Sequence, residues 1–369
     1  MKIRQAKNGE ISKILEVANN AFEPVRYKGY DFKVTMPQIY NTKIDYSKIH
    51  FVCEEEKTKN LVSVGGNLIR KISLKNNKYL FSNVGTVSTL PKFQGNGYMS
   101  KIMNKIEEQN VRKKVVFSIL TGDRKRYNNF GYEKVGFTFK LLLSSKLVKC
   151  NNNSIVVKEF QKNQKIISQM YDIYLKNIKI ILRSKEEFVL NLQAKGNLIF
   201  TLLKDEKVVG YFSFNKTKEQ IDEFYLSNID ETQNALDSIF NYFDFSRIYF
   251  FVNPLDKEYY LKLQNFAESV ETYDEIHLKV YNLEKFLEMI FKLNLVATNF
   301  KNKTYFYKID NVNYKIDITN NNLIIEKGNF QSNYDFTIQE FLRYIFSPTN
   351  FYDNEKLTLL FSFNKLDMF

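Results

Sequence analysis

A strand that must end before a proline, a loop with two glycines and an amphipathic helix follow one another in this chain and constrain its fold most. Residues 84–89 are rich in β-branched side chains, and Pro91 cannot donate to a continuing ladder. The loop that follows contains Gly95 and Gly97. Residues 98–112 then place apolar side chains at spacings of three and four, as an amphipathic helix does. Because a further strand is predicted at residues 115–120, the order indicates an α/β unit.

The glycine loop also indicates what this unit binds. Glycines let a ligand come close to the backbone, and free amides at a helix N-terminus favour an anion. The loop has neither the Gly-Lys-Ser/Thr of a Walker loop nor the G-x-G-x-x-G of a dinucleotide site. We therefore predict a site for the diphosphate of a small ligand. A plain turn before a helix is the alternative that the loop alone leaves open.

The length of 369 residues suits two or three domains at roughly 100–200 residues each. We expect a first domain at 1–150, a second at 151–283 and a third at 284–369. The second repeats the strand and helix order of the first without its glycine loop, so we interpret it as a degenerate duplicate. The third places short strands between two helices, as an α+β domain does. No low-complexity linker separates the three, so we expect one rigid body.

The remaining elements are predicted from the period of their apolar residues. Strands are expected at residues 3–4, 49–53, 61–70, 79–90, 198–203, 208–215, 220–227, 247–252, 304–309, 312–318 and 322–327. Helices are expected at residues 10–22, 164–181, 185–192, 231–243 and 337–346, with another from about residue 283.

Positive charge is concentrated in the first domain. Residues 1–150 carry 28 Lys and Arg against 12 Asp and Glu, a formal charge of +16, whereas the rest of the chain carries −3. Such a surplus suits a phosphorylated ligand and leaves nucleic-acid binding open. Only nine of the 54 basic residues are Arg, the side chain best suited to bidentate phosphate and guanine contacts. We therefore expect no nucleic-acid partner.

Cysteine, histidine and hydropathy patterns exclude several other classes. The two cysteines, Cys53 and Cys150, and the two histidines, His50 and His277, have no zinc-ligand spacing and form no disulfide framework. We expect no metal site. No stretch approaches 18 uninterrupted apolar residues, and the first residues lack the apolar core of a secretory signal. We therefore expect a cytoplasmic protein without a membrane partner.

The flanks of the glycine loop carry a family resemblance. Val87-Ser88-Thr89-Leu90-Pro91, Gln94-x-x-Gly97, an amphipathic helix, a strand and Tyr127-Asn128-Asn129-Phe130-Gly131-Tyr132-Glu133 together resemble the acetyl-coenzyme A core of GNAT N-acetyltransferases. The common pattern Gln/Arg-x-x-Gly-x-Gly/Ala ends here in Met99, a departure shared with the enhanced intracellular survival (Eis) branch. That branch also has a second GNAT-like domain, which the unit containing Val208-Val209-Gly210-Tyr211 resembles, and a terminal sterol-carrier-like domain. The sharp motifs cover only about residues 84–133.

The resemblance implies a fold and a set of roles. The fold would be tandem GNAT-like domains, catalytic then degenerate, followed by a sterol-carrier-protein-like domain that supplies the C-terminal carboxylate. Tyr127 would be the general acid and the carboxylate of Phe369 the general base. Val87 and Thr89 would pair their backbone with the pantetheine arm. Lys92, Lys101 and Arg126 are candidate phosphate contacts by charge alone, or solvated surface. The diphosphate would be held by Gln94, Gly95, Gly97, Tyr98, Met99 and Ser100.

The expected reaction transfers acetyl from acetyl-coenzyme A (acetyl-CoA) directly to an amine. The attacking alkylammonium must lose a proton and the departing thiolate must gain one, which requires a base and an acid. No covalent enzyme intermediate is needed, so neither cysteine is expected to be a nucleophile. Glu23 and Asp367 could line an anionic pocket for the amine or be ordinary surface acids. The resemblance implies aminoglycoside, lysine-like or other small amines, including lysine side chains, and a homo-oligomer, possibly a hexamer. A non-catalytic acyl-CoA-binding or scaffold protein remains the alternative.

Overall fold

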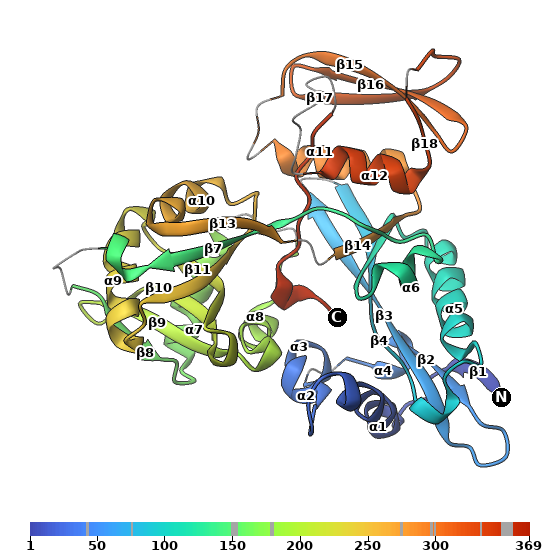
Figure 1. Ribbon diagram of the computed structural model, residues 1–369, viewed down its shortest axis with the longest axis horizontal. Coiled ribbons are helices and arrows are strands. Elements are labelled where there is room, and N and C mark those ends of the chain that lie inside the picture. Colours follow the sequence, from blue (N-terminus) through green and yellow to red (C-terminus); the bar gives the residue numbers. More distant parts are fainter. Residues whose placement is uncertain are drawn as a thin grey trace.

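The computed structural model describes three units, each built on its own β-sheet (Figure 1). It covers residues 1–369 except 42–43, 75–76, 149–153, 178–180, 274–275, 296–297, 299, 333 and 348–356. Cys150 and the domain boundary expected between residues 150 and 151 lie outside the described residues. None of the helices in the described part of the chain is long and apolar enough to cross a membrane.

The first unit is a seven-stranded sheet in the order β1-β2-β3-β4-β5-β14-β6. Helices α1 and α5 cover its opposite faces, because Val52 belongs to the apolar core under α1 and the next residue, Cys53, to the core under α5. The strands are β1 (Lys2–Gln5), β2 (His50–Glu54), β3 (Leu61–Leu74), β4 (Asn77–Thr89), β5 (Phe117–Thr121), β6 (Glu133–Lys134) and β14 (Ile276–Val280). The helices are α1 (Ile11–Phe22), α2 (Phe32–Thr35), α3 (Pro37–Tyr40), α4 (Tyr46–Ile49), α5 (Tyr98–Arg112) and α6 (Arg124–Asn128).

The second unit repeats this arrangement in a sheet of order β8-β9-β10-β11-β12-β7-β13. In both sheets an antiparallel run is followed by one parallel pair, β4 with β5 and β11 with β12. The strands are β7 (Thr138–Ser144), β8 (Val156–Glu159), β9 (Leu198–Lys204), β10 (Lys207–Asn215), β11 (Gln220–Leu226), β12 (Arg247–Val252) and β13 (Ala267–Tyr273). The helices are α7 (Gln164–Leu175), α8 (Lys185–Leu192), α9 (Thr232–Phe243) and α10 (Lys257–Leu263).

The two sheets exchange strands across the boundaries expected from the sequence. β7 precedes the expected boundary at residue 150 but pairs with β12 and β13 of the second sheet. β14 precedes the expected boundary at residue 283 but pairs with β5 and β6 of the first sheet. A short strand whose partners lie far away in the sequence carries no local signal of the sheet it will join, so sequence analysis missed this exchange.

The third unit is a four-stranded sheet, β17-β16-β15-β18, with two helices beside it. Its elements are α11 (Leu283–Asn294), β15 (Lys303–Ile309), β16 (Val312–Thr319), β17 (Asn322–Lys327), β18 (Asp335–Phe336) and α12 (Ile338–Phe346). Phe286 of α11 and Phe341 of α12 share one hydrophobic core with Phe81 and Phe117 of the first sheet. The third unit therefore packs directly on the first.

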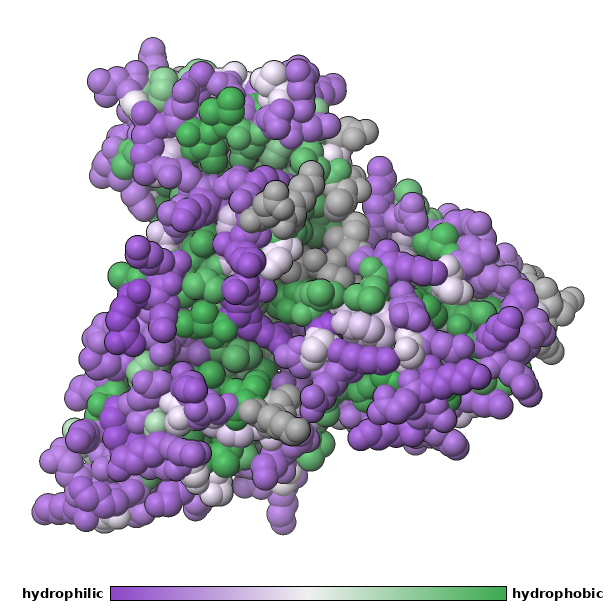
Figure 2. Space-filling model, turned by 180° about the vertical axis from the view of Figure 1, so that it is seen from behind, coloured by the Kyte–Doolittle hydropathy of each residue, from purple (hydrophilic) through white to green (hydrophobic). Residues whose placement is uncertain are grey.

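Residues 357–369, called here the tail, run from the third unit to the place where the first and second units meet (Figure 1). The tail contributes to three separate cores: Phe363 and Met368 to that of the third and first units, Leu366 to that of the second, and Phe369 to the core under α1. Figure 2 shows hydrophobic residues gathered toward the middle of one face, while hydrophilic residues cover most of its periphery. The tail thus connects the units through buried apolar side chains.

Most sequence-predicted elements are confirmed within a few residues. The helix predicted at residues 98–112 and the strand predicted at residues 247–252 have these bounds in the structure. The helix predicted at residues 164–181 is wrong in length, since α7 ends at Leu175. Strands β7, β13 and β14 were not predicted; each pairs with strands distant in sequence.

Candidate active site

The first sheet opens where its parallel strands diverge. Pairing of β4 with β5 covers only Phe81–Asn83 opposite Phe117–Ile119. The later part of β4, with Val87 and Thr89, therefore continues without β5 beside it. Both residues are half-buried. This leaves a sheet edge to which an extended ligand can add.

A bulge in β4 lies at this opening. The pairing register with β3 shifts between Val64 and Gly66, and Gly66 lies opposite Gly85. Thr86 has φ of 53°, in the left-handed region that β-branched residues rarely adopt. Its hydroxyl lies 2.6 Å from that of Tyr40. A strained residue held by a buried hydrogen bond is typical of functional sites.

The glycine loop next to the opening is exposed. Gly95 and Gly97 have φ of 79° and 71°, and a methyl group added at either would meet no other atom within 4 Å. Gly97 precedes α5 without a side-chain cap, and the first turn of α5 has no acidic residue. Ser100 is exposed, whereas Tyr98 and Met99 are half-buried. The start of α5 is therefore free to accept an anion.

Some side chains around the loop are turned to neighbouring groups. The Gln94 amide donates to the Thr89 carbonyl at 3.2 Å, which joins the loop to the end of β4. The ammonium of Lys92 lies 5.1 Å from the Phe93 ring centre, and that of Lys101 lies 5.7 Å from the Tyr98 ring centre. The two lysines place positive charge beside the loop.

Tyr127 lies on α6 and is only 6% exposed. Its ring packs so closely on Gly122 that an added methyl group there would come within 2.3 Å of it. Asp123 caps α6 by accepting from the Arg126 amide. Burial raises the pKa of Tyr127, while Arg126 acts in the opposite direction. Tyr127 is thus a neutral phenol at neutral pH, able to donate a proton.

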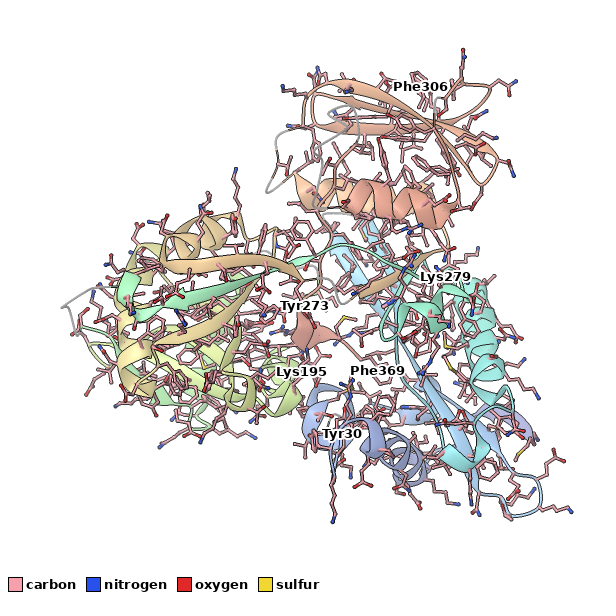
Figure 3. The ribbon with its side chains drawn as sticks, viewed as in Figure 1. Tyr30, Lys195, Tyr273, Lys279, Phe306 and Phe369 are labelled. Carbon is pink, nitrogen blue, oxygen red and sulfur yellow. The ribbon has the colours of Figure 1, made fainter. Side chains whose placement is uncertain are left out.

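Phe369 is buried against the first unit, on the side that faces the second unit (Figure 3). Methyl groups added at Gly66 and Gly85 would come within 2.1 Å of its ring and 2.5 Å of its carboxyl carbon. Its amide donates to Asn83 Oδ1 at 3.2 Å, and its ring centre lies 6.0 Å from that of His50. The carboxyl group of Phe369 is thus placed on β4, beside the bulge.

Two buried aromatic residues line the other side of Phe369. Tyr40 lies 6.2 Å from it between ring centres, and the Tyr40 hydroxyl bonds to both Thr86 and His50 Nε2. His50 Nδ1 lies 3.2 Å from the Tyr46 carbonyl, so this nitrogen carries a hydrogen and Nε2 accepts from Tyr40. Burial lowers the pKa of His50 to about 4, which keeps it neutral.

The structure brings the predicted site residues into two groups, one on each face of the first sheet. Tyr127 shares a hydrophobic core with Val87, Tyr98 and Met99, which joins the acid candidate to the opening and the loop. Phe369 belongs to the core under α1. Within the described residues no hydrogen bond or ring contact joins Tyr127 to Phe369.

The two acids considered for an anionic pocket have partners within the chain. Glu23 accepts from the Gly29 amide at 2.7 Å, and Asp367 accepts from Arg183 at 2.7 Å. Sequence analysis missed Asn83, Thr86 and Arg183. Two of these lie in a run with the pattern of a plain strand, and Arg183 stands between the apolar residues 180–182 and the polar residues 184–187 without belonging to a motif.

Residues 2–135 match the family model described as an acetyltransferase (GNAT) domain. The chain carries a GNAT acetyltransferase domain. It contains the β4–β5 opening, the glycine loop and Tyr127, so the prediction of an acyl-transfer enzyme of the GNAT type is confirmed. No curated protein matches the chain.

Solved structures share the fold over most of the chain. A GCN5-related N-acetyltransferase from Anabaena variabilis ATCC 29413 has a TM-score of 0.66 at 14% identity and covers 94% of this chain and 90% of its own. A probable N-acyltransferase from Enterococcus faecalis V583 has a TM-score of 0.64 at 15% identity, covering 94% and 89%. Eis1 from Mycobacterium abscessus has a TM-score of 0.62 at 10% identity, also covering 94% and 89%. These likenesses show the fold.

Proposed function

We propose that the protein is an N-acetyltransferase of the Eis type that moves acetyl from acetyl-CoA directly to an amine. The observation that carries this proposal is the position of the Phe369 carboxyl group on Gly85, beside the opening in a GNAT domain. The second unit would be a GNAT-like domain without a cofactor loop, and the third a sterol-carrier-like domain. The repeated strand order of the two sheets and the likeness to Eis1 support this arrangement.

Acetyl-CoA would lie across the glycine loop and into the opening. The backbone amides at the start of α5, together with Gly95, Gly97 and Ser100, would hold its diphosphate. Gln94, Tyr98 and Met99 would complete the loop, and the pantetheine arm would pair with β4 at Val87 and Thr89. The uncapped helix start and the open space around both glycines support this binding mode.

In the transfer step the amine nitrogen attacks the acetyl carbonyl carbon. A C–N bond forms, the C–S bond breaks, and the sulfur of coenzyme A takes a proton from the Tyr127 hydroxyl. The proton that the amine loses passes to the Phe369 carboxylate. Because burial raises the pKa of Tyr127, this residue stays protonated until the thiolate develops.

The acceptor would be an aminoglycoside, a lysine-like amine or another small amine. A carboxylate base attracts an alkylammonium before taking its proton. The +16 charge of residues 1–150 opposes the approach of polycations at long range, but screening over about 8 Å leaves nearby groups in control.

The experiment measures thiol release from acetyl-CoA with a panel of amines. Protein ending at Phe369 is compared with protein that carries extra residues after it. Extra residues remove the terminal carboxylate and have no room beside the buried ring, so we expect turnover to disappear. The same residues added before the exposed Met1 are the control and should leave turnover unchanged. Full activity in the C-terminally extended protein would exclude the carboxylate as base, and acetyl-CoA binding without turnover would favour the non-catalytic alternative.

A further inference from the structure

The last four residues of the tail are held by amide side chains from both flanking units. Asn191 of α8, in the second unit, donates to the Leu366 carbonyl at 2.8 Å and to Asp367 Oδ1 at 2.7 Å. From the first unit, Gln38 of α3 donates to the Met368 carbonyl at 3.1 Å and Asn83 to the Asp367 carbonyl at 3.0 Å. Hydrogen bonds to consecutive backbone groups determine the register of the tail as well as its presence.

The tail also forms a buried ion pair with the second unit. The guanidinium of Arg183 is 1% exposed and donates to Asp367 Oδ1 at 2.7 Å. Its other nitrogens bind Glu223 of β11 at 2.9 and 3.1 Å. The backbone of Arg183 is held as well. Its amide donates to the Tyr174 hydroxyl, and its carbonyl accepts from the Tyr171 hydroxyl. Arg183 is therefore a rigid point to which the tail is attached.

The second unit has room for the tail where its own sheet opens. Pairing of β11 with β12 covers only Gln220–Ile221 opposite Tyr249–Phe250. A pocket lies between the diverging strands, and Phe363, Asn364 and Asp367 of the tail form part of its wall. The opening that corresponds to the proposed cofactor site of the first unit thus receives the tail in the second.

A buried ion pair is weak evidence for stability, because desolvation of the charges offsets their attraction. The directional fork of an arginine is better suited to holding a partner in one place. Asp367 lies two residues before Phe369, a span of at most about 7 Å of extended chain. Any shift of Asp367 is therefore passed on to the carboxyl group on Gly85.

We infer that Arg183 is a positioning residue, which sets the reach of the tail through Asp367 so that the terminal carboxylate of Phe369 lies beside the bulge in β4. This inference rests on the proposed function for its catalytic meaning. It also gives the second unit a task, which is to anchor the base that acts in the first. Arg183 itself would touch neither acetyl-CoA nor the amine.

The experiment compares the full chain with its Asp367→Asn variant. This substitution keeps the shape of the side chain and leaves Arg183 paired with Glu223, so no buried charge is left without a partner. We expect kcat for thiol release to fall about tenfold or more, while KM for acetyl-CoA changes less than about twofold. Carboxypeptidase A, which removes aromatic C-terminal residues, should release Phe369 about ten times faster from the variant, because a loosened terminus is open more often.

Arg183→Lys provides a second variant in case the first does not fold. Lysine keeps the positive charge but has no planar fork with which to hold Glu223 and Asp367 together, so the same changes are expected. The control is Asp256→Asn, since Asp256 is a buried acid of the same pocket that accepts from Tyr225 of its own unit. It should leave kcat and the release of Phe369 unchanged.

Equal kcat and equal release of Phe369 in the wild type, Asp367→Asn and Arg183→Lys proteins would overturn the inference. The inference would also be overturned if the Asp256→Asn control changed kcat and the release of Phe369 as much as the two tail variants do. Such a result would indicate general loosening of the second unit. Failure of the proposed function looks different: the wild type would release no thiol with any amine. Faster release of Phe369 from both tail-loosening variants would then still support Arg183 as the anchor.

Discussion

Two glycines and the terminal residue show how one residue determines another at this site. Gly66 and Gly85 lie opposite each other in β3 and β4, and neither has the left-handed backbone that would itself require glycine. Their missing side chains are instead explained by Phe369, whose ring and carboxyl group occupy that space. The pair of glycines therefore forms a seat for Phe369, which is visible only once the fold brings residues almost 300 positions apart together.

A substitution at Tyr127 tests the proposal that this residue is the general acid. Replacing Tyr127 with Phe removes the hydroxyl and keeps the ring that packs on Gly122. We expect kcat to fall by about 10²–10⁴, the usual contribution of general acid–base catalysis, with KM for acetyl-CoA nearly unchanged. Steady-state thiol release measures both values. Tyr132→Phe is a matched control, because its hydroxyl is also buried but bonds to Ser118. A kcat within twofold of the wild type for Tyr127→Phe would exclude Tyr127 as the acid.

Local motifs predict part of the candidate site at this scale. Tyr127, Gly95 and Gly97 lie in short patterns whose chemistry can be read from neighbouring residues. Thr86 and Arg183 could not be found in this way. The left-handed backbone of Thr86 depends on the bulge opposite β3, and the partners of Arg183 lie 40 and 184 residues away.

At the scale of elements, the loop and helix α5 form the part of the site with the simplest physical requirements. The helix needs a start without a side-chain cap, and the loop needs two left-handed residues that leave the approach open. Glycine satisfies both because it adopts positive φ without steric cost and adds no atoms beside an anion. The predicted bounds of α5 are confirmed because apolar period, Pro91 and glycines all indicate the same start.

Gly97→Ala tests this element. Alanine in the left-handed region costs about 1–2 kcal/mol, and the added methyl group projects into the space proposed for the diphosphate. We expect KM for acetyl-CoA to rise about tenfold or more, beyond the effect of strain alone. Isothermal titration with coenzyme A provides the matching affinity. Gly9→Ala is the control, because Gly9 has φ of 83° and equally open surroundings away from the loop. Equal coenzyme A affinity in the two variants would contradict the proposed binding mode.

Elements with a clear period were predictable, and their assembly into sheets was not. The hairpin of β9 and β10 and the strand β17 are defined by nearby residues, so their positions follow from the sequence. β7 and β14 owe their places to partners in other parts of the chain. An interpretation by consecutive domains therefore assigns each to the wrong sheet.

At the scale of the whole molecule, the strand exchange and the tail make the three units depend on one another. β7 and β14 each complete a sheet that begins elsewhere in the chain, and the tail adds side chains to three cores. A cofactor domain with its own complete core would need neither a strand from elsewhere in the chain nor side chains from the tail. We infer that the position of the terminal carboxylate is tied to the stability of the entire protein.

Removing residues 366–369 tests this dependence. The deletion takes Leu366, Met368 and Phe369 from three different cores, and each large buried side chain contributes about 2–5 kcal/mol. Because domains are stable by only about 5–15 kcal/mol, we expect the urea midpoint to fall steeply and one cooperative transition to remain. Far-UV circular dichroism and tyrosine fluorescence measure the unfolding, since the chain has no Trp. Phe306→Ala is the control, because Phe306 is 38% exposed in the third unit and should change the midpoint little. If the shortened chain kept the midpoint of the full one, or if the two probes separated into two transitions, the units would be independent and the terminus a local attachment.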